Sequence, residues 1–460
     1  MTVTVSSRAT NRWRLVALAL AMLLPSLGIS IANVALPSLA EGFGADFAQV
    51  QWVVVSYLLA VTTLIVGAGR LGDMFGRRRM LLGGIAIFTI ASVACSVAPS
   101  LFLLLAVRAI QGAGAALMMS LTIAAVADAL PKDQMGRAIG LLGTVSAVGT
   151  ALGPSLGGGL IAWAGWPAVF AVVAAVGAVS FVMGLRFFER GAPLAGQKRS
   201  FDVSGFALLV IALGGYSLSM TAAIAPLVGA AVAMLALALF IAVELRVPAP
   251  LVSLASLADR TLGGSLVSLA LVTTIVMATL VVGPFYLTGW AGLNAAQAGL
   301  VMSIGPTVSA LVGVPAGRLV DRRGARPAML AGLGSTMGGC MLMVLLPGAL
   351  GLPGYGAALI FITAGYALFQ VANNTAVMHK VPADRRGVVS ALLGLSRNLG
   401  LVSGASAMGA VFALASNGLP VLGLPAGGLT GLEATFALGA VLSGTSLCLI
   451  LIGRAGQGDR

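Results

Sequence analysis

The sequence GRLGDMFGRR at residues 69–78 occurs a second time in the chain, as GRLVDRRGAR at residues 317–326. Six of the ten positions are identical, and both copies lie between two long apolar stretches. A charged, glycine-containing turn that recurs between apolar stretches indicates that the chain consists of two related halves. Internal repeats of this kind are typical of membrane proteins in which one half moves against the other.

The composition places the chain in a lipid bilayer. Only 8% of the 460 residues are charged and 59% are hydrophobic, whereas a soluble domain has about 25% charged residues. The net charge of +13 does not indicate nucleic-acid binding, because the basic residues occupy short turns rather than one soluble surface. We therefore expect lipid as the main surrounding, no nucleic-acid partner and no metal site, since His379 is the single histidine and the three cysteines lie far apart.

Fourteen apolar stretches are long enough to cross a bilayer, which takes roughly 20 residues each. They lie near residues 14–36, 48–68, 80–98, 101–126, 137–161, 166–187, 203–222, 225–245, 263–287, 296–316, 328–347, 355–377, 388–414 and 432–453. We expect the first stretch to be a retained membrane helix. A cleaved signal peptide is the alternative, but the stretch is longer than a signal-peptide core and no clear small-residue cleavage site follows it.

The basic residues predict the orientation of these stretches. Of the 26 Lys and Arg residues, all except Arg108 and Arg397 fall at the chain ends or in every second turn. The intervening turns carry acidic residues and tryptophans instead, namely Glu41, Asp46, Trp163, Trp166 and Trp290. Because basic turns mark the cytoplasmic side, we expect an even number of helices with both termini in the cytoplasm, in the inner membrane of a bacterium.

The spacing of the repeat predicts the domain organisation. The two copies begin 248 residues apart, whereas six membrane helices with short turns take roughly 190 residues here. The difference between these two lengths is close to the length of the two apolar stretches between residues 203 and 250. We therefore predict an all-α membrane fold with two six-helix bundles, residues 1–190 and 251–460, and a linker with two inserted helices at residues 191–250.

The repeated turn has a functional interpretation and a plainer one. Gly69 and Gly76 permit a tight turn and close approach of two helix ends, and Asp73 can face an opposing helix terminus or an arginine. In the plainer interpretation, Arg77 and Arg78 only anchor the next helix at the anionic leaflet. The fixed spacing of the glycines and the acid, and its recurrence, favours a gating role.

The first copy also resembles the loop between spans 2 and 3 of the major facilitator superfamily, with the pattern G-x-L-x-D-x-x-G-R-R-R. In that family the acid and the arginines form a cytoplasmic latch that stabilises the outward-open state, which the resemblance assigns to Asp73 and Arg77. Asp128, at the inner end of span 4, is the candidate partner of the latch arginines, and a solvated helix-end acid is the alternative. The resemblance extends from about residue 15 to about residue 450.

Two further motifs lie within the membrane. Burying Arg108 in span 4 costs about 2.5–3.5 kcal/mol and therefore indicates function. The string from Arg108 through Gln111 and Gly112 is similar to the family's span 4 motif, whose arginine is linked to proton transfer, so Arg108 and Asp128 are the candidates for proton coupling. Span 5 has small residues that allow close helix contact and a proline that bends the helix. This second string resembles the antiporter motif of exporters and consists of Gly149, Gly153, Pro154, Gly157 and Gly158.

The span count narrows the resemblance to the fourteen-helix drug:proton antiporter branch, as do the strings QWV at 51–53 and FDVSG at 201–205. Members of that branch usually carry an acid in the middle of span 1, where this chain has Gly28. A buried carboxylate is the usual proton carrier, whereas the guanidinium groups of Arg108 and Arg397 stay charged. We therefore expect coupling through acids near span ends, or weak coupling, and a cavity that favours neutral or anionic substrates.

Polar and aromatic residues within the spans are the candidates for the substrate cavity, with helix packing as the alternative for each. They are Asn33, Trp52, Tyr57, Gln111, Phe285, Tyr286, Phe369, Gln370, Asn373, Asn374 and Arg397. A mostly apolar pocket with few polar groups suits drug-like ligands. No nucleotide-binding loop and no catalytic constellation occur, so we expect neither a cofactor nor enzyme activity.

Together these features predict a monomeric efflux transporter of the multidrug type, which exports drug-like small molecules in exchange for protons by alternating access. Two alternatives remain open from the sequence. One is an exporter dedicated to a single metabolite or antibiotic, and the other is a facilitator without proton coupling.

Overall fold

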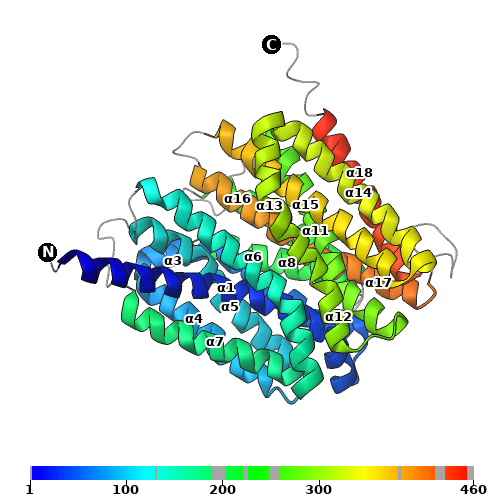
Figure 1. The fold of residues 1–460 in the computed structure, drawn as a ribbon, viewed down its shortest axis with the longest axis horizontal. Coiled ribbons are helices and arrows are strands. Elements are labelled where there is room, and N and C mark those ends of the chain that lie inside the picture. Colours follow the sequence, from blue (N-terminus) through cyan, green and yellow to red (C-terminus); the bar gives the residue numbers. More distant parts are fainter. Residues whose placement is uncertain are drawn as a thin grey trace, which may run out of the picture.

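The computed structural model describes residues 3–129, 132–188, 202–220, 226–247, 260–381, 386–419 and 430–452, and every regular element in these ranges is a helix (Figure 1). Helices form because the long apolar stretches must satisfy their backbone hydrogen bonds within themselves once they leave water. Thirteen of the described helical segments are long and apolar enough to cross a membrane, and Ser204–Met220 is a shorter apolar helix. The expectation of an all-α membrane fold is confirmed.

The N-terminal group comprises the helices from residue 3 to residue 187. Its members are α1 (Val3–Phe43), α2 (Phe47–Val50), α3 (Trp52–Phe75), α4 (Arg77–Ser96), α5 (Leu101–Ala129), α6 (Lys132–Ala164) and α7 (Trp166–Phe187). Within the group, α1 packs on α6 and α7, and α5 packs between α3 and α4. The group occupies one side of the molecule, drawn from blue to green in Figure 1.

The C-terminal group comprises the helices from residue 260 to residue 452. Its members are α11 (Arg260–Phe285), the π-helix η1 (Tyr286–Trp290), α12 (Ala295–Met302), α13 (Ile304–Arg323), α14 (Ala325–Leu350), α15 (Leu352–Lys380), α16 (Arg386–Ser403), the π-helix η2 (Gly404–Met408), α17 (Gly409–Ser416) and α18 (Gly431–Ile452). Pro284 lies in the last turn of α11, two residues before η1 begins. Because proline removes a backbone donor, it accounts for the wider turn that follows it.

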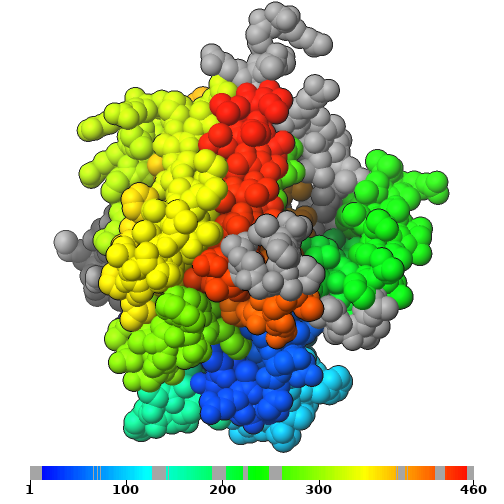
Figure 2. Space-filling model, turned by 90° about the vertical axis from the view of Figure 1, so that its right-hand side faces the viewer, coloured from blue at the N-terminus to red at the C-terminus, as the bar shows by residue number. Residues whose placement is uncertain are grey.

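Two helices, α8 (Val203–Met220) and α9 (Pro226–Glu244), form a hairpin between the two groups in sequence. They pack mainly on each other, and α8 also contacts α3 and η2. Figure 2 shows the hairpin as a green lobe at the side of the molecule. The division into two six-helix bundles and two inserted helices stays a prediction, and its boundaries at 190 and 250 lie outside the described residues.

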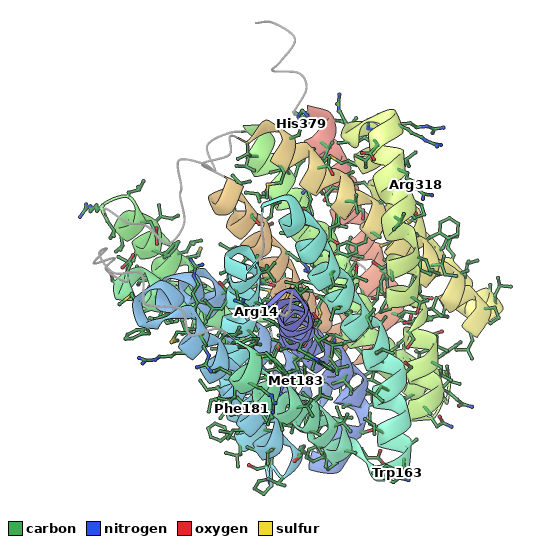
Figure 3. The ribbon with its side chains drawn as sticks, turned by 60° about the vertical axis from the view of Figure 1, so that its left-hand side comes forward. Arg14, Trp163, Phe181, Met183, Arg318 and His379 are labelled. Atoms are coloured by element: carbon green, nitrogen blue, oxygen red, sulfur yellow. The ribbon has the colours of Figure 1, made fainter. Side chains whose placement is uncertain are left out.

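The turns that carry basic residues and the turns that carry tryptophan lie at opposite ends of the molecule. Arg318 and His379 lie in the upper part of Figure 3 and Trp163 lies at its lower edge. Trp163 is 84% exposed, as expected of a tryptophan in a membrane–water interface. We call the end of the molecule that holds the repeated turns the repeat end, and we call the opposite end the tryptophan end. The charge pattern predicts that the repeat end is cytoplasmic.

Candidate functional site

Both copies of the repeat adopt the same turn. In the first copy α3 ends at Phe75, Gly76 has φ 92°, and α4 begins at Arg77. In the second copy α13 ends at Arg323, Gly324 has φ 85°, and α14 begins at the next residue. Side chains with a Cβ atom rarely adopt this left-handed region. The glycine of each copy is therefore needed to reverse the chain between two spans.

The shared arginine of the repeat caps a helix in each group. Arg78 donates from Nε to the carbonyl of Phe188 at 2.8 Å and from Nη2 to the carbonyl of Leu185 at 3.0 Å. Arg326 donates from Nη2 to the carbonyls of Ile450 and Leu451, each at 3.4 Å. These carbonyls belong to the last turns of α7 and α18, where the helix itself supplies no donor and the dipole favours a cation.

The contacts of Arg78 stay inside the N-terminal group, so this structure assigns it a helix-capping role that the sequence did not suggest. Gly69 lies close to α5, because a Cβ atom there would stand 3.7 Å from the hydroxyl of Ser120. The side chains of Asp73 and Asp128 lie outside the described part of the structure. The latch between the acid and the arginines therefore stays a prediction.

Arg108 on α5 is completely buried among the helices of the N-terminal group. Its Nε donates to the carbonyl of Val53 at 2.9 Å and its Nη1 donates to the carbonyl of Gly28 at 3.4 Å. Nη1 also donates to the amide oxygen of Gln111, whose nitrogen donates to the hydroxyl of Ser92 at 2.7 Å. The guanidinium thereby connects α1, α3, α4 and α5.

The ring of Tyr57 covers the Arg108 guanidinium, with 4.3 Å between the guanidinium carbon and the ring centroid. The Tyr57 hydroxyl donates to the carbonyl of Pro25 at 3.1 Å. These acceptors are neutral groups and an aromatic face, which stabilise a buried cation without a carboxylate. Nη2 of Arg108 has no hydrogen-bond partner among the described residues. Arg108, Tyr57 and Gln111 thus form a cross-brace in this conformation and do not line an open cavity.

Phe88 occupies the space beside Gly28. A Cβ atom on Gly28 would stand 3.0 Å from Cζ of Phe88 and 3.9 Å from the hydroxyl of Tyr57. A carboxylate at this position therefore requires the Phe88 ring to move. The packing of the Phe88 ring is therefore consistent with a glycine, and not an acid, at position 28.

The antiporter-like motif on α6 contacts two different helices. Gly149, Gly153 and Gly157 face α1: Cβ atoms on Gly149 and Gly157 would stand 2.9 Å from the carbonyl oxygen of Leu23 and 2.8 Å from Cγ1 of Ile31. A Cβ atom on Gly153 would contact the hydroxyl of Ser30. Only glycine permits this distance between the two backbones.

The other side of the motif faces α12 of the C-terminal group. A Cβ atom on Gly158 would contact the carbonyl oxygen of Ala295, and one on Gly299 would contact the carbonyl oxygen of Pro154. Figure 1 shows α6 and α12 side by side. We call this contact of Pro154 and Gly158 with Ala295 and Gly299 the α6–α12 seam. It joins the two groups near the tryptophan end.

The sequence profile of the Major Facilitator Superfamily matches residues 18–405. The chain belongs to the major facilitator superfamily. It is a multi-pass membrane transporter of that superfamily and not an enzyme.

Three relatives indicate the range of functions in this part of the superfamily. The multidrug resistance protein Stp of Mycobacterium tuberculosis is 32% identical over 416 residues, which cover 88% of this chain and 76% of that protein. The riboflavin transporter RibZ of Clostridioides difficile is 29% identical over 401 residues, or 87% of this chain and 88% of that protein. The tetracenomycin C resistance and export protein of Streptomyces glaucescens is 29% identical over 409 residues, or 87% of this chain and 75% of that protein.

A solved structure confirms the fold. A bacterial homologue of the human lysosomal transporter Spinster, described as inward-facing and occupied, aligns with a TM-score of 0.69, 17% sequence identity and 97% coverage of both chains. At this identity the likeness concerns the fold alone. The predicted major facilitator fold is therefore confirmed.

A second contact between the two groups of this transporter lies beside the α6–α12 seam. The ring of Phe47 on α2 packs against Phe285 at 4.7 Å and against Phe412 at 5.0 Å between centroids. Gln51 is completely buried, and a Cβ atom on Gly409 would contact its amide oxygen. Gln51 lies directly before the start of α3, whereas the repeat begins near the end of α3. The two groups are therefore in contact at the tryptophan end.

The predicted cavity residues fall into distinct environments. Asn33 and Asn373 are completely buried, and neither amide has a hydrogen-bond partner in the described part of the chain. Asn374 and Arg397, by contrast, are exposed. Asn373 and Asn374 thus differ in burial, because neighbouring residues on a helix point about 100° apart.

The aromatic candidates and Gln370 mostly pack within the C-terminal group. Tyr286 on η1 stacks on Tyr355 with 5.5 Å between ring centroids. Gln370 donates to the Tyr366 hydroxyl at 2.9 Å, and Phe369 is completely buried. Of the remaining candidates, Trp52 is half-buried at the start of α3 and Phe285 belongs to the aromatic contact with Phe47.

Proposed function

We propose that this protein is a secondary exporter of the fourteen-helix drug:proton antiporter branch, which expels drug-like small molecules from the bacterial cytoplasm across the inner membrane. The observation that carries the proposal is the α6–α12 seam, where the antiporter-like motif forms the contact between the two groups. Export by alternating access requires a contact of this kind, since the exit must be closed while the substrate enters. The names of two relatives, a multidrug resistance protein and an antibiotic export protein, support the same direction of transport.

The seam would open and close during transport. The atoms nearest to Gly158 and Gly299 across the seam are backbone atoms of alanine, proline and glycine. Small residues permit the closest approach of membrane helices without binding them through strong polar interactions. The seam and the aromatic contact of Phe47 would together form the closed exit in the present state.

The substrate cavity would lie between α1, α15 and α16. Burying the amides of Asn33 and Asn373 without partners is unfavourable unless water or a ligand reaches them in another state. Arg397 is an exposed cation on α16, which contacts both α11 and α3. Because a charge within a membrane span faces a water-filled cavity rather than lipid, Arg397 would line this cavity and favour neutral or anionic substrates.

The latch at the repeat end would stabilise the opposite, outward-open state through Asp73, Arg77 and Asp128. Only the first copy of the repeat keeps three consecutive arginines, whereas Ala325 interrupts the second copy. We therefore expect Asp73→Asn to impair transport more than Asp321→Asn at matched expression. Equal losses in the two variants would contradict this ranking.

Two alternatives each have an observation in their favour. A dedicated exporter is supported by relatives that are named for single compounds, tetracenomycin C and riboflavin. A facilitator without proton coupling is supported by the packing of Phe88 beside Gly28, which fills the place of the usual acid. In either case the monomer would be the transporting unit, because both groups come from one chain.

The proposal is tested by measuring drug susceptibility in cells that lack the protein, that overproduce it, and that overproduce a Gly158→Leu variant. Resistance to several unrelated compounds, abolished by the variant, is the expected result. Gly159→Leu is the matched control, because Gly159 has open space around its Cα. Resistance to one compound would favour the dedicated exporter, and unchanged susceptibility to every compound would contradict export.

A further inference from the structure

The tryptophan end contains a second internal repeat, formed by two short helix starts. Asp46 and Gln49 form a capping box at the start of α2, and Asn294 and Gln297 form the same capping box at the start of α12. The two boxes lie 248 residues apart, as do the two copies of the turn at the repeat end. The segment that runs from α2 into α3 is therefore the counterpart of α12 and α13.

The helix that packs against each of these segments is repeated as well. Gly149, Gly153 and Gly158 of α6 recur 251 residues later as Gly400, Gly404 and Gly409, which lie on α16, η2 and α17. A Cβ atom on Gly149 would stand 2.9 Å from the carbonyl oxygen of Leu23 on α1. A Cβ atom on Gly400 would contact the carbonyl oxygen of Ala270 on α11 in the same way. The last glycine of each set faces the opposite group, so the contact of Gly409 with Gln51 is the counterpart of the α6–α12 seam.

The two contacts differ in one side chain. With the spacing of 248 residues, Gln51 corresponds to Gly299, so the α6–α12 seam closes with no side chain at this position. In the counterpart, the completely buried side chain of Gln51 lies against Gly409. Neither atom of its amide group has a hydrogen-bond partner among the described residues. Burial of an unpaired amide is unfavourable, and because the other seam closes without one, packing does not explain the glutamine.

The amide of Gln51 is held in a fixed place beside aromatic rings. The backbone N–H of Gln51 donates to the carbonyl of Phe47 at 3.0 Å, and its own carbonyl accepts two backbone hydrogen bonds from the first turn of α3. The Phe47 ring contacts the rings of Phe285 and Phe412. A Cβ atom on Gly409 would contact the Gln51 amide oxygen and lie 3.3 Å from the Phe47 ring. A polar amide thus adjoins aromatic rings from three elements, as in binding sites for aromatic ligands.

We propose that the Gln51 amide and the rings of Phe47, Phe285 and Phe412 form a ligand site that holds the departing substrate when α17 separates from α2. A primary amide presents a donor and an acceptor side by side and carries no charge. It therefore pairs through two hydrogen bonds with a ligand edge that places an N–H group beside a carbonyl group. The site selects neutral, planar aromatic molecules with an amide, lactam or imide edge. Its place in the transport cycle rests on the proposed export.

The same contacts explain how the ligand is released. In the closed state described here, Gly409 lies against the amide oxygen of Gln51, so the return of α17 to α2 displaces a ligand from the amide. The unpaired amide raises the free energy of the closed state, whereas a bound ligand lowers that of the open state. A ligand of this class therefore shifts the equilibrium toward the open exit.

The proposal is tested with the full-length protein in lipid nanodiscs and the fluorescent probe aminonaphthalimide, a neutral and planar aromatic imide. Its N-methyl derivative has the same aromatic face but lacks the N–H donor. Fluorescence anisotropy, corrected for nanodiscs without protein, should show about tenfold tighter binding of the unmethylated probe to the wild type. Gln51→Met should abolish this preference. It should also raise the melting temperature of the ligand-free protein, because it removes an unpaired buried amide.

Gln49→Met is the matched control, since Gln49 is exposed and lies two residues away, and it should leave the preference unchanged. Equal binding of the two probes to the wild type, no binding of either probe, or a preference that persists in Gln51→Met would overturn the proposal. A lower melting temperature of Gln51→Met, or its failure to fold, would assign the amide a structural role and would also overturn it. The assay needs no transport, so the expected binding without export of any compound would refute export and leave the site standing.

Discussion

Gly158→Ala should open the tryptophan end of the transporter. The new Cβ atom would contact the carbonyl oxygen of Ala295 and lie 3.2 Å from Cα of Ala296, whereas carbon atoms pack favourably at about 3.5–4.0 Å. The opposing atoms are backbone, so no side-chain rotation relieves the overlap and α6 and α12 must separate. Overpacking of this kind costs about 1–3 kcal/mol.

Only the closed state bears this cost, because the seam is absent once the groups separate. The equilibrium should therefore shift away from the closed state by a factor of about 5–150. Gly159→Ala is the control, since a Cβ atom there meets nothing within 4 Å. It should leave the equilibrium unchanged.

The shift can be measured as the accessibility of a buried position at the same end. Val50 is completely buried, so Val50→Cys combined with Cys448→Ser provides a single reporter besides two buried native cysteines. A membrane-impermeant maleimide should label this cysteine faster in Gly158→Ala than in Gly159→Ala. Equal labelling rates and equal transport in the two variants would refute the role of the seam.

The remaining predictions concern the N-terminal group and the repeat. Arg78→Ala should lower the free energy of unfolding by about 1–2 kcal/mol. Arg326→Ala should lower it by less, because the capping hydrogen bonds of Arg326 are longer. Thermal melting in detergent measures both effects with the exposed Arg79→Ala as control, and the same melting temperature in all three variants would contradict the prediction. Gly28→Asp should lower the melting temperature through the clash with Phe88, and adding Phe88→Ala should restore it. An unchanged melting temperature in Gly28→Asp alone would show that the ring moves freely.

The spans and the repeated turn were accessible from the sequence because their causes are local. Backbone hydrogen bonding in lipid forces helices onto long apolar stretches, and a turn between two of them needs a glycine such as Gly76 or Gly324 at positive φ. The family resemblance rested on the same local strings, and the match over residues 18–405 bears it out. These features can be predicted without knowing which helices are in contact.

The environments of the candidate site residues depend on contacts between helices that are distant in the sequence. These contacts could not be predicted from the sequence. Arg108 was recognisable from the sequence as a costly charge within a span. Its acceptors, however, come from α1, α3 and α5, and the sequence does not show that these contacts bury it completely. Gly299 carries no motif, yet it completes the α6–α12 seam.

Export driven by a proton gradient, as proposed above, is tested most directly with purified protein in vesicles. The assay uses a compound to which overproduction confers resistance and an imposed pH gradient, acidic on the side into which the compound is pumped. Accumulation of the compound against its own gradient, abolished by a protonophore and by Gly158→Leu, is the expected result. Equilibration that is insensitive to the pH gradient would contradict proton-driven export and establish a facilitator instead.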